Sequence, residues 1–142
     1  MRLYLAGQYA KREVLKAYAN QLEAIGIKVT SRWLMEDKPL NTKIGDDTEE
    51  FYRETAVVDL EDIDTADGIV FFSEDPHVGV PRGGRHVEFG YGLAKSKYMF
   101  TVGPRENIFH FLSRIHQYDT FEQFLEVAEV AEELYGQTTR RG

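Results

Sequence analysis

The chain has 142 residues, a formal charge of −7 and no cysteine, which excludes disulfides, thiolate metal sites and a cysteine nucleophile. Its hydrophobic share of 42% and charged share of 29% are ordinary for one globular domain. The acidic balance argues against duplex nucleic acid as a partner, although a few local arginines or a helix N-terminus can still hold a small anion. The first apolar run is too short for a signal peptide, and no stretch has the length of a membrane span, so we expect a cytoplasmic protein.

The N-terminal part of the chain predicts a strand, a helix and a second strand. Residues 2–6 form a short apolar run, and residues 11–25 carry apolar side chains three and four apart. Gly26 suits a helix end, and residues 27–30 predict the second strand. The polar connection over 31–47 is long for a compact domain. This order of elements is typical of a parallel α/β sheet.

The remainder alternates helix and strand. Thr48 can cap a helix that runs to about residue 65, and residues 69–72 are wholly apolar, as a central parallel strand should be. We expect that helix to bury Phe51, Ala56, Val57, Leu60 and Ile63. Four elements follow: a helix at 85–96, a strand at 98–102, a short strand or turn within 107–118, and a helix through 134 capped by Asp119 or Thr120. Five strands with crossovers predict a doubly wound parallel sheet, flavodoxin-like or Rossmann-like, in one domain over 1–135 with a frayed tail at 136–142.

Glu88, in the segment GGRHVEFGYGLA, is the first candidate for chemistry. It stands near the start of the helix after the central strand, and we expect Val87, Tyr91 and Leu93 to pack on the sheet. Ligands bind beyond the carboxyl ends of strands in such sheets, so this carboxylate would point into the crevice. Alternatively, it only complements the helix dipole. Two glycines inside the helix, each costing about 1 kcal/mol relative to alanine, indicate a close approach to its backbone.

Three other side chains could join Glu88, and each has a plain structural alternative. Asp59 lies in an acidic helix whose carboxylates are mostly expected at the surface. Only its position near the carboxyl ends of the strands favours a catalytic role. Tyr4 is in the first strand, where tyrosine usually fills the core, but a buried phenol needs a partner and a carboxylate would serve. Trp33, the only tryptophan, could stack on a base or fill the core.

An anion site is predicted where the Glu88 helix begins. Arg82, Arg85 and His86 surround a Gly-Gly pair that includes Gly84, and backbone N–H groups, the helix dipole and arginines together attract anions. A flexible loop with solvated arginines is the alternative. The four histidines show no metal-ligand spacing, so we expect neither a metal site nor a cofactor.

Four segments in order, LYLAGQY, DLEDIDTADGIVFF, GGRHVEFGYGLAKSK and VGPRENIF, resemble the nucleoside 2-deoxyribosyltransferase family, which includes related nucleoside 5′-monophosphate N-glycosidases. They cover about residues 2–110. The resemblance implies a flavodoxin-like or Rossmann-like fold and a homo-oligomer, a dimer or larger. It also implies that the substrate is a small-molecule nucleoside or nucleotide and that no cofactor is needed. No association with a membrane is expected.

The resemblance also assigns roles to residues. It makes Glu88 the nucleophile, Asp59 the group that contacts the nucleoside and can protonate the leaving base, and Tyr4 the residue that orients the glutamate. Asn107 matches a residue that a neighbouring subunit lends to the site. The site-lining loop of the family corresponds to Gly7, Gln8 and Tyr9.

One position departs from the family pattern. Six residues before the nucleophile, the transferases carry an aspartate and the monophosphate hydrolases a small hydroxyl residue, whereas this chain has Arg82, which suits a phosphate. The predicted function is cleavage or exchange of the N-glycosidic bond of a (deoxy)nucleoside, with the sugar passing to another base or to water through a covalent Glu88 adduct. Hydrolysis of nucleoside 5′-monophosphates is the first alternative. A non-catalytic nucleotide-binding or sensing module is the second, because fold does not determine function.

Overall fold

The computed structural model describes residues 1–35, 47–75 and 83–141. Five parallel strands form one sheet in the order β2-β1-β3-β4-β5. They are β1 (Arg2–Ala6), β2 (Lys28–Val29), β3 (Gly68–Phe72), β4 (Tyr98–Val102) and β5 (Ile115–Tyr118). This strand order is the flavodoxin-like form of the doubly wound sheet, so the predicted fold class is confirmed.

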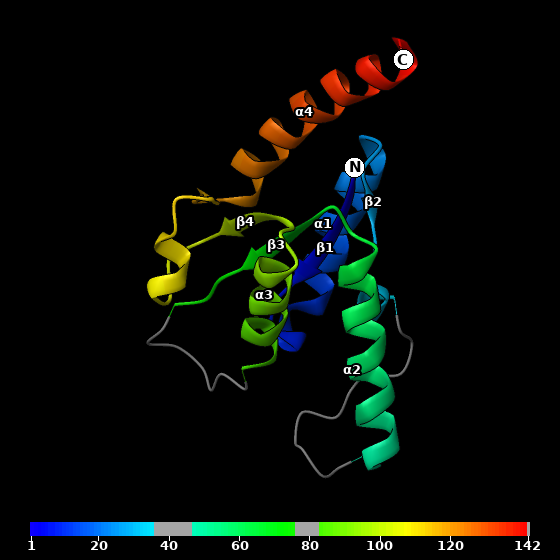
Figure 1. The fold of residues 1–142 in the computed structure, drawn as a ribbon, viewed down its shortest axis with the longest axis vertical. Coiled ribbons are helices and arrows are strands. Elements are labelled where there is room, and N and C mark those ends of the chain that lie inside the picture. The colour runs from blue at the N-terminus through cyan, green and yellow to red at the C-terminus, as the bar shows by residue number, and fades with distance from the viewer. Residues whose placement is uncertain (36–46, 76–82, 142) are drawn as a thin grey trace.

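Helices cover both faces of the sheet (Figure 1). They are α1 (Arg12–Ala24), α2 (Glu49–Asp64), α3 (Gly84–Ala94) and α4 (Phe121–Arg141), with short 3-10 helices η1 (Tyr9–Lys11), η2 (Arg32–Leu34) and η3 (Ile108–Phe111). On one face Tyr18 of α1 stacks on Phe121 of α4, with ring centroids 3.9 Å apart. On the other face the Tyr91 hydroxyl of α3 donates to Asp64 of α2 at 2.7 Å. No helix within the described part of the chain is both long and apolar enough to cross a membrane.

Local signals place the helix ends. The Thr48 hydroxyl accepts the Phe51 N–H at 3.1 Å and so caps α2. Thr120 caps α4 in the same way, by accepting the Gln123 N–H at 3.2 Å. Gly26, with φ +94°, ends α1 as predicted. Helix α4 runs to Arg141, seven residues beyond the expected end at residue 134, and so takes in most of the segment expected to be a frayed tail.

Two helices bury other side chains than the sequence predicted. Helix α3 rests on the sheet through Arg85, Phe89 and Gly92, while Val87 is 67% exposed. These three positions are four and three residues apart and so lie on one face of the helix. Because one of them is an arginine, the spacing of apolar residues alone does not reveal this buried face. In α2 the expected core residues Ala56 and Val57 are both exposed.

The two glycines inside α3 have different surroundings. A Cβ at Gly92 would lie 2.0 Å from the Cδ1 of Ile69, so the helix can approach β3 only because this position has no side chain. A Cβ at Gly90 would meet no described atom within 4 Å. The expected close approach to the backbone therefore occurs at Gly92, and the sheet itself is what approaches.

This difference predicts opposite effects for two otherwise identical substitutions. Gly92→Ala should lower the free energy of unfolding by about 1–3 kcal/mol, because the core must shift to admit the methyl group. Gly90→Ala should raise it by up to about 1 kcal/mol, because alanine favours the helix and meets nothing. Urea unfolding followed by circular dichroism measures both. Equal losses in the two variants would contradict this account of the α3 packing.

Candidate active site

The candidate site lies where the sheet reverses its direction of winding. From β1 the chain passes to β2 on one side, whereas from β3 it passes to β4 on the other. The helices that follow β1 and β3 cover opposite faces, and ligands bind at such a switch point. Tyr4 in β1 lies beside Ile69 in β3, and Glu88 is in the second turn of α3.

Tyr4 and Glu88 meet in a partly buried hydrogen bond. Tyr4 is fully buried, and its hydroxyl donates to Oε2 of Glu88. A buried phenol requires such a partner. The structure thus brings the strand tyrosine and the helix glutamate together, as expected from the sequence.

The electrostatics of this pair favour a protonated Glu88. Burial raises the pKa of Glu88 to about 8; the hydrogen bond from Tyr4 opposes this rise, and the negative charge of Asp59 adds to it. Burial also raises the pKa of Tyr4 well above its ordinary value, with further contributions from the charges of Glu88 and Asp59. Asp59, which is partly buried on α2, is therefore close enough to influence both groups. The three side chains named as catalytic from the sequence form one electrostatically coupled cluster.

The first loop follows β1 and leads into α1. Gly7 has a packing reason to be glycine, since a Cβ there would lie 2.6 Å from Cδ2 of Leu15. Gln8 is partly exposed and precedes η1. The Tyr9 hydroxyl accepts a hydrogen bond from Nη1 of Arg12 at 2.9 Å. The structure therefore places this loop at the carboxyl end of β1, and it gives Gly7 a role in packing.

Trp33 belongs to the core. It is 8% exposed, and its indole N–H donates to the carbonyl oxygen of Leu5 at 3.0 Å. Its ring centroid lies 6.3 Å from that of Tyr9. Of the two roles considered for Trp33, the structure favours the core plug, because the ring is enclosed and its polar atom is already bonded.

The predicted anion site at the start of α3 is only partly present. Arg82 lies outside the described residues. Gly84 is the first residue of the helix. Gly83 before it has φ +83°, a backbone conformation that glycine adopts readily. A Cβ at either position would meet no described atom within 4 Å. Arg85 does not face a ligand as we expected. It is 7% exposed, and its guanidinium forms a bidentate ion pair with Glu106, so its charge is already neutralised.

Asn107 lies apart from Glu88 within the chain. Its Oδ1 accepts the Phe109 N–H at 2.9 Å, and it borders a hollow of about 370 Å³. The remaining lining residues are His86, Phe89, Gly90, Leu93 and Phe109. Because the α3 residues among them lie on the side of the helix away from Glu88, the structure does not bring Asn107 to the Tyr4–Glu88 pair of its own chain.

The sequence reasoning missed two buried acids. Glu106 follows β4 and binds Arg85. Asp62, one of several acids in a helix whose carboxylates were mostly expected at the surface, is buried and accepts the backbone N–H of Arg32 at 2.9 Å and its Nε at 2.7 Å. The position of Glu106 in a loop at the carboxyl edge was the one available signal. Among the described residues, no group of three or more metal-ligating side chains is arranged to hold a metal ion.

The chain was compared with known proteins. No protein-family model matches it, and no match was found among curated proteins. A solved CMP N-glycosidase from Clostridium botulinum, BcmB, is 17% identical over 92% of this chain and 99% of its own, with a TM-score of 0.58. A 2-deoxyribosyltransferase from Bacillus psychrosaccharolyticus is 19% identical over 88% and 90%, with a TM-score of 0.65. A conserved protein from Enterococcus faecalis is 16% identical over 92% and 98%, with a TM-score of 0.57.

At these identities the likeness establishes the fold. It agrees with the flavodoxin-like strand order and extends over most of the chain. An N-glycosidase and a deoxyribosyltransferase are also the two enzyme groups of the family that the four sequence segments resemble.

The raised pKa of Glu88 predicts how the stability of the protein depends on pH. Between about pH 4.5, where an unfolded glutamate ionises, and about pH 8, the folded chain keeps a proton that the unfolded chain has lost. The unfolded state therefore binds fewer protons, and stability falls as the pH rises through this window. Glu88→Gln does not titrate. Its melting temperature relative to wild type should rise steadily from pH 5 to pH 8.5 in differential scanning calorimetry.

Glu129→Gln, on the exposed side of α4, is the matched control for this experiment. A difference between Glu88→Gln and wild type that stays constant across the window would contradict the burial of the Glu88 carboxyl.

Proposed function

We propose that the protein belongs to the nucleoside 2-deoxyribosyltransferase family and cleaves or exchanges the N-glycosidic bond of a (deoxy)nucleoside or its 5′-monophosphate. The observation that carries this proposal is the partly buried, hydrogen-bonded Tyr4–Glu88 pair at the switch point of the sheet, with the pKa of Glu88 raised to about 8. The fold shared with a CMP N-glycosidase and a 2-deoxyribosyltransferase supports it, as does the resemblance of the four sequence segments.

The first chemical step forms a covalent adduct. Glu88 passes its proton to Asp59, and the resulting carboxylate attacks C1′ of the sugar; the C1′–N bond breaks, and its electron pair passes to the base nitrogen. Asp59 protonates the departing base. Tyr4 holds Oε2 of Glu88 by its hydroxyl, which leaves Oε1 for the attack.

The second step resolves the adduct. Water or a second base attacks C1′, the bond to Glu88 breaks, and Glu88 regains its carboxylate. Asp59 takes the proton of the incoming nucleophile and returns it to Glu88, so both groups regain their starting state. Two displacements at C1′ retain the sugar configuration.

The burial of Glu88 suits this chemistry. A carboxylate removed from water is held by fewer hydrogen bonds, so it is more basic and more nucleophilic than an exposed one. The hydrogen bond from Tyr4 limits this effect and fixes the orientation of the carboxylate. A sensing module has no need of a carboxyl group buried in this way, so the pair favours catalysis over binding alone.

The acceptor is left open between base and water. Arg85, which had favoured a phosphate, is committed to Glu106, and Arg82 lies outside the described residues. The experiment below therefore distinguishes transfer from hydrolysis.

The test is chromatography of free base released from a panel of nucleosides and 5′-monophosphates, with and without an acceptor base. Wild type should release or exchange base from at least one member of the panel. Glu88→Gln, which keeps the shape and folds, should be slower on the order of a thousandfold or more because it lacks the nucleophile.

Dependence on the acceptor base would identify a transferase, and its absence a hydrolase. Binding without release of base from any substrate would overturn the proposal in favour of a sensing module. Equal rates for wild type and Glu88→Gln would remove Glu88 as the nucleophile.

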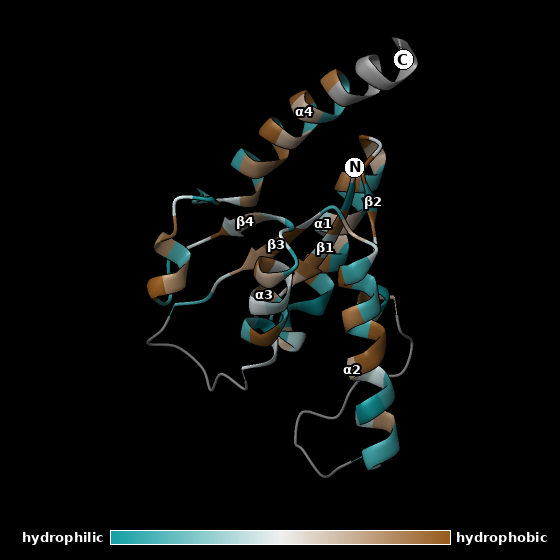
Figure 2. Ribbon diagram, in the orientation of Figure 1, coloured by the Kyte–Doolittle hydropathy of each residue, from teal (hydrophilic) through white to brown (hydrophobic). Residues whose placement is uncertain are grey.

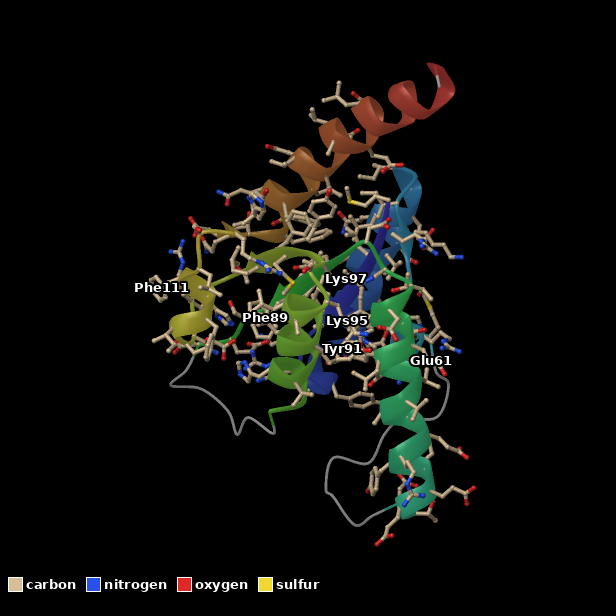
Figure 3. All side chains as sticks on the ribbon, viewed as in Figure 1. Glu61, Phe89, Tyr91, Lys95, Lys97 and Phe111 are labelled. Atoms are coloured by element: carbon tan, nitrogen blue, oxygen red, sulfur yellow. The ribbon has the colours of Figure 1, made fainter. Side chains whose placement is uncertain are left out.

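The proposal includes a homo-oligomer in which Asn107 serves the site of a second copy. Its support is an apolar surface on and after η3, formed by Ile108, Phe109, Phe111 and Leu112. Ile108 is 77% exposed, and Phe111 lies on the outer side of η3 in Figure 3. In Figure 2 this segment is brown at both ends with a teal part between them. Phe109 also lines the hollow that Asn107 borders. Exposed apolar clusters of this kind are typical of protein–protein interfaces.

Charge placed in that apolar surface should therefore separate the copies. Ile108→Glu is expected to shift the protein from oligomer to monomer in analytical ultracentrifugation, because it places a carboxylate in the interface. Val130→Glu, at an exposed apolar position on α4, is the matched control and should leave the oligomer intact. A wild-type monomer, or an oligomer unaffected by Ile108→Glu, would contradict this arrangement.

A further inference from the structure

Helix α3 begins without strong local support. It starts at two consecutive glycines, Gly83 and Gly84, and within the described residues no side chain caps its first turn. Glycine at these positions adds no side-chain contact and leaves the backbone free to move. The first turn nevertheless precedes Glu88 directly, so something else must hold it.

Two side chains of this turn contact the rest of the fold: the centroid of the His86 ring lies 5.4 Å from that of Phe71, and Arg85 forms an ion pair with Glu106. The two carboxylate oxygens of Glu106 accept from the two terminal nitrogens of Arg85, one of them at 2.7 Å. The side chains are only 6% and 9% exposed. The guanidinium also lies over the ring of Phe71 in β3, 5.1 Å from its centroid. A bidentate pair of this kind fixes both distance and direction.

Glu106 is itself hydrogen-bonded to residues that follow strands β3 and β4. Its Oε2 accepts the N–H of Glu74, which follows β3, at 3.0 Å. Its own N–H donates to Nδ1 of His110 at 3.0 Å, in η3. The segment that carries Glu106 leaves β4 through Gly103, where a Cβ would lie 2.5 Å from Oγ of Ser73. The carboxylate therefore connects the loops after β3 and β4 to the first turn of α3.

A buried ion pair is weak evidence for stability, because the cost of removing two charges from water can exceed their attraction. Such a pair contributes more plainly to geometry. Arg85 and Glu88 are three residues apart and so lie on the same side of α3. A rotation of the first turn would carry Glu88 away from Tyr4.

We propose that Glu106 is a positioning residue: through Arg85 it holds the first turn of α3 and so sets where Glu88 meets the substrate. This inference rests on the proposed function, in which Glu88 is the nucleophile. Neither Glu106 nor Arg85 touches the reacting atoms in this scheme.

The experiment replaces the ion pair by an apolar pair in the double variant Arg85→Met/Glu106→Leu. Apolar replacement of a buried ion pair commonly keeps or raises stability, whereas loss of the acceptor of the Glu74 N–H lowers it modestly, so this variant should fold with a melting temperature at or a few degrees below that of wild type. The pair has no net charge before or after the change, so its long-range effect on Glu88 is small. Glu74→Gln is the matched control, since it removes the ion pair of Glu74 with Lys11 and keeps the backbone N–H that Glu106 accepts.

In the double variant, kcat for base release should fall by about 10- to 100-fold with little change in KM, because a misplaced nucleophile slows the reaction of bound substrate. Glu74→Gln should keep the kcat of wild type. Unchanged kcat in a folded double variant would overturn the proposal and leave the pair a purely structural role. A rise in KM confined to 5′-monophosphates would overturn it too, by making Arg85 a phosphate ligand.

A second measurement needs no turnover. Carbon-13 NMR of labelled glutamate, with Glu88→Gln to assign the signal, follows the titration of Glu88 directly. Release of the first turn admits water, so the pKa of Glu88 should fall from about 8 toward its ordinary value in the double variant and stay raised in Glu74→Gln. An unchanged titration in the double variant would overturn the positioning role. If wild type releases no base, the proposed function fails, and this titration still decides whether Glu106 positions Glu88.

Discussion

The contact between Tyr4 and Glu88 depends on how closely α3 lies on the sheet. Glu88 and Gly92 are four residues apart and share one face of the helix, and Gly92 sits against Ile69, the neighbour of Tyr4 across β1 and β3. A side chain at Gly92 would lift the helix from β3. The hydrogen bond to Tyr4 would then lengthen, and water would reach the carboxyl group. The parallel pairing of β1 with β3 and one glycine thus create the environment that raises the pKa of Glu88.

Charged residues around this contact divide into two kinds. The Arg85–Glu106 and Arg32–Asp62 pairs join loops to helices, and within each pair opposite charges compensate each other. The Tyr4, Glu88 and Asp59 cluster brings together groups that all become negative on losing a proton: the charges of Glu88 and Asp59 raise the pKa of Tyr4, and the charge of Asp59 raises the pKa of Glu88. Compensated pairs fix geometry, whereas a cluster of acids holds protons that a reaction can move. The second arrangement is therefore the one from which chemistry is inferred.

Much of the fold could be predicted because its signals are local. The strand of residues 69–72, the cap at Thr48 and the helix end at Gly26 each depend on a few consecutive residues. The packing of α3 could not, since Arg85 reaches a core position only when paired with Glu106, 21 residues away. Asp62 was not singled out and Trp33 was left open for the same reason, since their partners are distant in sequence: Asp62 binds Arg32, 30 residues away, and Trp33 binds the carbonyl oxygen of Leu5, 28 residues away. The meeting of Tyr4 with Glu88 was expected through the family resemblance, and periodicity alone would not have selected it.

A shared fold cannot by itself choose between catalysis and binding, since flavodoxin-like sheets serve both. The choice rests on how much the site lowers the stability of the folded protein. A glutamate whose ionisation is opposed by burial makes the folded state less favourable at neutral pH, and an amide or apolar residue would avoid that cost. Binding a nucleotide requires no such group, because neutral donors and acceptors recognise a base and a sugar equally well. The proposed role as a nucleophile makes use of it, since the same loss of solvation that destabilises the carboxylate makes it more reactive once its proton has left.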